Sequence, residues 1–124
     1  MKNYVLGLLI VAQLNVFAVV QNVGNFDQYL SSKKVVIVKF FLPGCAPCGR
    51  LAPIFNAASN LFSADPNVAF LEVSGNNRAV TSRYGVRRFP TIIVFVNGRE
   101  IMRREGAGWS AQSLADVVNN ALNS

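Results

Sequence analysis

Residues 35–48 read Val-Val-Ile-Val-Lys-Phe-Phe-Leu-Pro-Gly-Cys-Ala-Pro-Cys, and this stretch decides the fold class of the chain. Its first seven residues are β-branched or aromatic apart from Lys39, which is typical of a strand buried on both faces. Pro43 and Gly44 then end the strand. From residue 48 to residue 62, apolar residues recur at the spacing of one helical face. The stretch therefore predicts a strand, a turn, two cysteines and a helix in direct succession.

The rest of the chain continues this alternation of strands and helices. We expect further strands at residues 19–23, 68–73, 91–96 and 99–104, and further helices at residues 26–30, 77–84 and 110–122. Asn97-Gly98 is the strongest short hairpin signal, and it joins the last two strands. Such an order implies an α/β, three-layer fold, in which a central mixed sheet of four to five strands has helices on both faces.

The composition limits the kinds of catalytic and metal sites that the chain can form. The chain has 124 residues, of which 52% are hydrophobic, and this fits one folded domain. It contains no histidine and two cysteines, which excludes a Cys/His zinc site and any nucleophile activated by histidine. The net charge is +6, but no basic run is longer than two residues. We therefore expect a basic soluble surface, with neither a nucleic acid nor a metal as partner.

The first residues have the pattern of an export signal. Lys2 precedes an apolar run over Tyr4–Ala12, two polar residues interrupt the apolar pattern, and residues 16–18 fit a signal-peptidase site. We expect residues 1–18 to be a cleaved signal peptide and residues 19–124 to be the mature domain. Two alternatives stay open: an uncleaved membrane anchor, for which the apolar run is short, and a buried first element of the fold.

The two cysteines are the strongest candidates for chemistry. A cysteine at a helix N-terminus faces unpaired backbone N–H groups and the positive end of the helix dipole. Both favour the thiolate, so we expect the pKa of Cys45 to fall below its free value of about 8.5. Cys48, one helical turn further on, can attack a mixed disulfide formed by Cys45. Pro47 suits the first turn because it has no N–H to lose and its φ is already helical.

Several ordered motifs together resemble the thioredoxin family from about Val23 to the C-terminus, in register apart from about one extra residue near Gly108-Trp109. The resemblance is carried by Val36–Phe41, Cys45–Cys48, Leu51–Phe55, Tyr84–Thr91, Val94–Gly98 and Gly106–Ala107. It implies that Pro90 is cis and faces the cysteine pair, and that the Phe89 backbone pairs with an extended substrate. It also implies that Gly106 allows a substrate backbone to come close. A simple turn glycine is the alternative at that position.

The chain departs from the family pattern at several positions. Gly44 stands where the family usually has a tryptophan, which forms an apolar wall of the groove. Trp109 either replaces part of that wall or belongs to the core. Lys39 stands where thioredoxins usually bury an aspartate, and Phe70 occupies the position of that aspartate's lysine partner. An ammonium there would favour the Cys48 thiolate and make the pair more oxidising than a cytosolic thioredoxin. Alternatively, Lys39 snorkels or pairs with Glu72.

These observations predict an exported protein-disulfide oxidoreductase, in the bacterial periplasm or in a eukaryotic secretory route. We expect it to be a monomer that needs no cofactor beyond the Cys45–Cys48 disulfide. Its partners would be protein thiols or disulfides and a second redox protein that resets the pair. The net direction, reduction or oxidation, stays open. The alternative function is a binding or scaffold module in which the same two cysteines form a static structural bridge.

Overall fold

A computed structural model describes residues 19–20 and 26–124 of the chain. The strands are β1 (Val19–Val20), β2 (Val35–Phe41), β3 (Val68–Ser74), β4 (Thr91–Val96) and β5 (Arg99–Glu105). The helices are α2 (Phe26–Ser32), α3 (Ala46–Leu61), α4 (Arg78–Arg83) and α5 (Ala111–Leu122). The strands form one sheet in the order β1-β3-β2-β4-β5. β1, β3 and β2 are parallel, whereas β4 is antiparallel to both β2 and β5.

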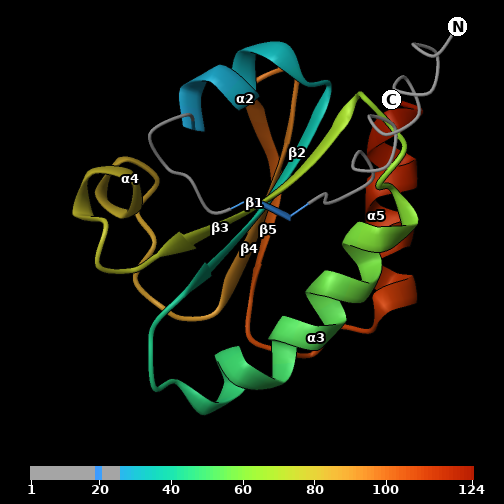
Figure 1. The fold of residues 1–124 in the computed structure, drawn as a ribbon. Coiled ribbons are helices and arrows are strands. Elements are labelled where there is room, and N and C mark those ends of the chain that lie inside the picture. Colours follow the sequence, from blue (N-terminus) through green and yellow to red (C-terminus); the bar gives the residue numbers. More distant parts are fainter. Residues whose placement is uncertain (1–18, 21–25) are drawn as a thin grey trace, which may run out of the picture.

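Helices cover both faces of this sheet, so the expected three-layer architecture is confirmed. In Figure 1, α3 and α5 lie together on one side of the sheet, and α2 and α4 lie on the other. Each face has its own apolar core, because strand residues alternate between the two faces. Along β2, Val35 and Ile37 belong to the core under α3 and α5, whereas Val36 and Val38 belong to the core under α2. The apolar run is thus buried on both sides, as its composition predicts.

The same alternation fixes the direction of Lys39. Lys39 lies on the same face of the sheet as Val35 and Ile37, the face that α3 covers. Only 3% of its surface is exposed. Its ammonium lies 5.2 Å from the centre of the Phe55 ring of α3. A charged side chain therefore lies inside the core beneath α3, where it needs a partner of opposite charge.

Strand register brings three segments to one end of the sheet. Phe40, near the end of β2, pairs with Thr91 at the start of β4, and Thr91 pairs with Glu105 at the end of β5. α3 begins five residues after β2 ends. The cysteines, the segment that precedes β4 and the segment that follows β5 therefore meet at this end, which is the lower end in Figure 1.

Local signals explain where several elements begin and end. Asn97 and Gly98 have φ values of 51° and 80°, as the two-residue hairpin requires. Ser110 caps α5 and exchanges hydrogen bonds with Ser113. The predicted first strand is observed at Val19–Val20, and its other residues, like the predicted signal peptide, lie outside the described residues. In the described part of the chain, no helix has both the length and the hydropathy for a membrane span.

Candidate active site

Cys45 and Cys48 form a disulfide at the start of α3, with their Cα atoms 5.2 Å apart. Cys45 is the N-cap residue, and its sulfur accepts a hydrogen bond from the backbone N–H of Cys48 over 3.2 Å. Cys45 is partly exposed, whereas Cys48 is only 5% exposed. An incoming thiol would therefore reach the sulfur of Cys45 more easily than that of Cys48.

The turn before α3 holds Cys45 at the helix terminus. Gly44 has φ of 79°, a conformation that costs little only for glycine, and the Cys45 N–H donates to the Leu42 carbonyl over 3.3 Å. Pro47 lies in the first turn of α3, as expected. Backbone N–H groups in this turn have no acceptor within the helix, so the N–H that proline lacks costs no hydrogen bond.

A cis peptide bond joins Phe89 to Pro90, as the resemblance implies. The Phe89 carbonyl oxygen lies 3.8 Å from the Cys45 sulfur, and Pro90 is buried. Gly106, with φ of 97°, donates its backbone N–H to the Pro90 carbonyl over 2.8 Å. The structure thus brings Phe89, Pro90 and Gly106 to the disulfide, although they are about 40 to 60 residues away from it in sequence.

Lys39 forms an ion pair with Glu72 of β3, with 2.7 Å between Nζ and Oε2. The pairing alternative is therefore confirmed, but the ammonium is buried and does not snorkel. The two residues face each other directly in the parallel register, whereas Phe70 faces Ile37. The ion-pair partner of Lys39 is therefore Glu72, two residues after Phe70 on β3.

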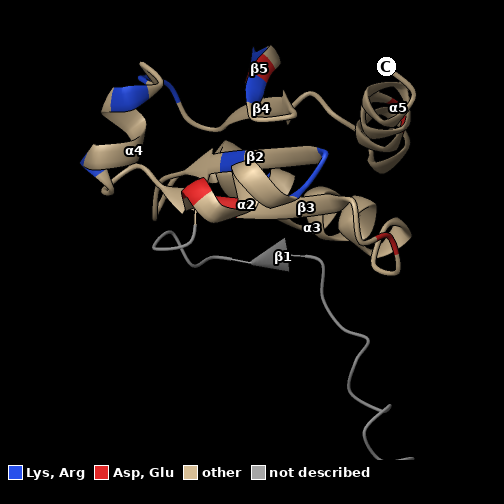
Figure 2. Cartoon of the chain, turned by 90° about the horizontal axis from the view of Figure 1, so that it is seen from above, with Lys and Arg blue, Asp and Glu red and all other residues tan. Residues whose placement is uncertain are grey.

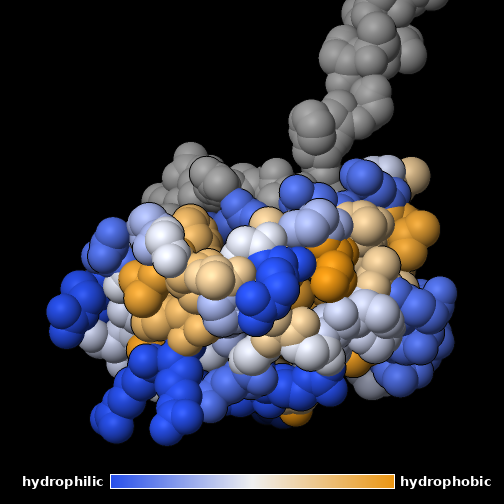
Figure 3. All heavy atoms as spheres, turned by 90° about the horizontal axis from the view of Figure 1, so that it is seen from below, coloured by the Kyte–Doolittle hydropathy of each residue, from blue (hydrophilic) through white to orange (hydrophobic). Residues whose placement is uncertain are grey.

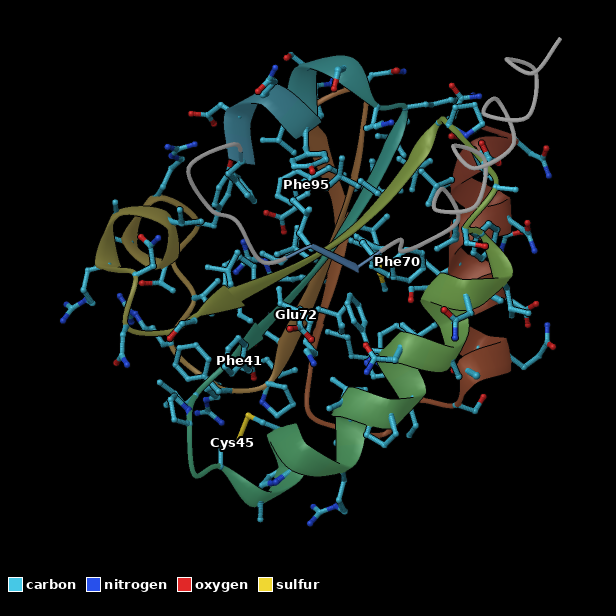
Figure 4. The ribbon with its side chains drawn as sticks, in the orientation of Figure 1. Phe41, Cys45, Phe70, Glu72 and Phe95 are labelled. Carbon is cyan, nitrogen blue, oxygen red and sulfur yellow. A yellow bond between two sulfur atoms is a disulfide. The ribbon has the colours of Figure 1, made fainter. Side chains whose placement is uncertain are left out.

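The ion pair lies at one side of a cavity that also reaches the disulfide. This cavity has a volume of about 270 Å³, and Lys39, Glu72, Phe41, Cys45 and Cys48 are among the residues that line it. Figure 4 shows Cys45 at the lower end of the sheet, with Phe41 and Glu72 above it on β2 and β3. A buried ammonium and a mostly buried carboxylate thus border the same space as the two sulfurs.

Gly75 is a site residue that sequence reasoning missed. A Cβ atom at this position would lie 2.6 Å from the Leu42 side chain and 2.7 Å from the Phe89 ring. Leu42 belongs to the turn before Cys45, and Phe89 belongs to the cis-proline segment. Gly75 therefore lets these two segments pack together beside the disulfide. Only the tertiary arrangement reveals this, because Gly75 follows β3 and has no sequence signal of its own.

Trp109 lies in the core rather than in the wall of the groove. It is 6% exposed and packs in the cluster beneath α3 and α5. The Arg104 guanidinium covers its ring at 3.6 Å from the ring centre and donates to the Gly108 carbonyl. The core alternative is therefore the correct one.

A disulfide at the start of a helix, facing a cis-proline across the end of a mixed sheet, defines the class of thioredoxin-fold proteins with a paired-cysteine site. A sequence model of the family, described as Thioredoxin, matches residues 17–120. The chain belongs to the thioredoxin family.

Individual relatives and a solved structure agree with this membership. Protein disulfide isomerase-like 2-3 of Oryza sativa subsp. japonica is 38% identical over 87 residues, which are 69% of this chain and 20% of the relative. Chloroplastic thioredoxin Y of the same species is 32% identical over 112 residues, covering 90% of this chain and 66% of the relative. The solved thioredoxin Mala s 13 of Malassezia sympodialis superimposes with a TM-score of 0.70 at 26% identity, covering 86% of this chain and 91% of that one. The chain spans about a fifth of the length of the disulfide isomerase.

Proposed function

We propose that this protein is an exported thiol–disulfide oxidoreductase that exchanges disulfides with protein substrates through Cys45 and Cys48. One observation carries the proposal: the more exposed sulfur of the disulfide caps α3 and faces the backbone of the cis-proline segment. Membership of the thioredoxin family supports the same reaction class. A disulfide that only stabilised the fold would need neither the exposure of Cys45 nor the neighbouring cis-proline segment.

The oxidising direction begins from the disulfide that the structure contains. A substrate thiolate attacks the Cys45 sulfur, the Cys45–Cys48 bond breaks, and Cys48 leaves as a thiolate. A second substrate thiolate then attacks the substrate sulfur of this mixed disulfide, and Cys45 leaves as a thiolate. Two electrons have passed to the protein, and the substrate holds the new disulfide. The reducing direction is the reverse of these steps, with Cys45 as nucleophile and Cys48 as the residue that releases the substrate.

The helix terminus assists both directions. The backbone N–H of Cys48, in the first turn of α3, donates to the Cys45 sulfur in the disulfide. This donor and the positive end of the helix dipole would stabilise a thiolate there, so we expect the pKa of the reduced Cys45 to be lowered. A stabilised thiolate is also a better leaving group when a mixed disulfide is resolved.

Phe89, Pro90 and Gly106 would bind the substrate segment. Pro90 has no backbone N–H, and Phe89 presents its carbonyl beside Cys45, so an extended peptide could pair with this backbone as an added strand. The hydrogen bond from Gly106 to the Pro90 carbonyl fixes the two segments relative to each other. A peptide held in this way would bring its own sulfur to that of Cys45.

Lys39 would influence the redox potential of the Cys45–Cys48 pair. Its ammonium would favour the Cys48 thiolate, but Glu72 at 2.7 Å offsets most of this charge. The predicted shift toward a more oxidising potential is therefore the balance of two opposite charges. Replacement of either partner should reveal the effect of the other.

Residues 1–18 would direct export and be removed. The apolar run after Lys2 supports this proposal, and the family match begins at residue 17, next to the proposed cleavage site. Expression of the whole chain in a secreting host tests it: the N-terminal residue of the mature protein should be Val19. Recovery of the full-length chain from the membrane fraction would indicate an anchor instead.

Titration of the disulfide in glutathione buffers tests the proposed redox function. An exchanging pair should become reduced within the range of biological thiol buffers, with a potential above about −300 mV. A potential below that value, with no reaction at Cys45, would indicate the structural bridge of a binding module. The expected protein is a monomer whose partners are protein thiols or disulfides and a second redox protein that resets the pair.

A further inference from the structure

The segments that surround the disulfide are rich in arginine. Residues 42–50, 86–90 and 104–108 carry the cysteines, the cis-proline and the glycine loop, and they contain four arginines and one acidic residue. These residues are Arg50, Arg87, Arg88, Arg104 and Glu105, and all five are exposed. The site end thus has an excess of positive charge that no other charged group on these segments balances.

The acidic residue on these segments neutralises little of this charge. Glu105 lies 3.9 Å from Arg88, and both side chains are more than half exposed, so their attraction is weak. Elsewhere, Asp27 is paired with Arg83, and Glu100 is paired with Arg103. Figure 2 shows basic residues on α4, on the segment between α4 and β4, and on β5.

The groove beside the sulfurs combines apolar side chains with open space. A Cβ atom at Gly44 or at Gly49 would meet no other atom within 4 Å, so open space flanks the cysteines where larger side chains could stand. Trp109 is buried and does not reach this space. In Figure 3, which views this end of the molecule, hydrophilic side chains surround the apolar ones and project beyond them. Backbone pairing and charge are therefore two means by which the site can choose among substrates.

Arg87 and Arg88 lie next to the backbone that would bind the substrate. They directly precede Phe89, whose carbonyl lies 3.8 Å from the Cys45 sulfur. A peptide that pairs with the Phe89 backbone would place the residues next to its own cysteine near these guanidinium groups. Arginine binds carboxylates through two parallel hydrogen bonds and attracts them from a distance.

We propose that the preferred substrates are protein segments in which the reacting cysteine is flanked by acidic residues. This inference rests on the proposed redox function and adds the substrate class to it. The guanidinium groups of Arg87 and Arg88 select such a segment, and Arg50 and Arg104 add to the attractive field. Attraction of this kind raises association rates and weakens with added salt.

Three peptides of equal length test the proposal. Each contains one disulfide whose cysteines are flanked by glutamate, by serine or by lysine, and the reduced protein is mixed with each of them at low and at high salt. The glutamate peptide should be reduced on the order of tenfold faster than the lysine peptide at low salt, and the ratio should approach one at about 0.5 M salt. Equal rates for the glutamate and lysine peptides would overturn the proposal.

Matched variants locate the effect. R87Q/R88Q should lose most of the preference, whereas R87K/R88K should keep its salt-dependent part. K33A/R99A removes the same charge at the opposite end of the sheet and should retain the full preference. If K33A/R99A lost as much as R87Q/R88Q, net charge rather than these two arginines would be responsible. Reduction of the serine peptide reports the redox function separately: no reduction of any peptide would mean that the proposed function itself fails.

Discussion

Lys39 and Glu72 face each other directly across β2 and β3, with 2.7 Å between the ammonium and a carboxylate oxygen. Their side chains are 3% and 12% exposed, so water screens the attraction between the two charges only weakly. A buried ion pair contributes little compared with apolar residues of the same size, but removal of one partner of such a pair is strongly destabilising.

K39M should therefore lower the free energy of unfolding by about 3–5 kcal/mol, because it leaves the Glu72 carboxylate buried without its ammonium. The double variant K39M/E72L should recover most of this loss, because neither charge remains. Urea unfolding of the oxidised protein measures both quantities. Additive losses in the double variant would show that the two side chains do not act as a pair.

E72Q should make the redox potential of the Cys45–Cys48 pair less negative. The Lys39 ammonium would then favour the Cys48 thiolate without an opposing carboxylate, which stabilises the reduced form. A tenfold change in the exchange equilibrium corresponds to about 30 mV, and a shift on this order is expected in glutathione titrations. K39M/E72Q is the matched control and should return to the wild-type potential or below it. Identical potentials in all three proteins would remove Lys39 from the tuning of the pair.

G75A should slow thiol–disulfide exchange and destabilise the fold by about 1–3 kcal/mol. The added methyl group would lie within 2.8 Å of Leu42 and Phe89, so the two segments beside Cys45 would have to separate. G49A is the control, because its methyl group meets no atom within 4 Å and alanine favours a helix. Equal stability and equal rates in G75A and wild type would show that the two segments do not need this close contact.

The fold should lose stability at acidic pH partly through Glu100. Hydrogen bonds from Arg103, at 2.6 and 2.7 Å, hold the pKa of Glu100 below its ordinary value of 4.5. The unfolded chain then binds a proton before the folded one does, so this contribution is complete above about pH 4.5 and is lost as the pH falls through the lower folded value. Because both side chains are about a third exposed, the effect should be at most about 1 kcal/mol. Unfolding of E100Q at pH 7 and at pH 3 should show a difference from wild type that is present at pH 7 and small at pH 3; an equal difference at both would contradict this role.

The sequence predicted the sheet better than the contacts within the site. Val35–Phe41 was predicted with its observed bounds, because a continuous β-branched and aromatic run has few other stable conformations. α3 begins two residues earlier than predicted, since Cys45 caps the helix and Ala46 and Pro47 form its first turn. The cis-proline segment came from the resemblance, because spacing alone cannot reveal a peptide isomer.

The contacts that could not be predicted from the sequence depend on strand register and on packing between distant segments. The partner of Lys39 remained open because a shift of two residues along β3 keeps the same face and changes the neighbour. Gly75 meets Leu42 and Phe89 only after three loops come together. Trp109 could be assigned to the groove or to the core until the helices that cover it were in place.

We expect Cys45, and not Cys48, to exchange with substrates. Variants C48S and C45S, each incubated with the same disulfide peptide, test it directly by mass spectrometry under non-reducing conditions. C48S should accumulate a stable mixed disulfide on Cys45, because the residue that would release the peptide is absent, and C45S should form little or none. Faster adduct formation on Cys48 of C45S, or no adduct on Cys45 of C48S, would contradict the account.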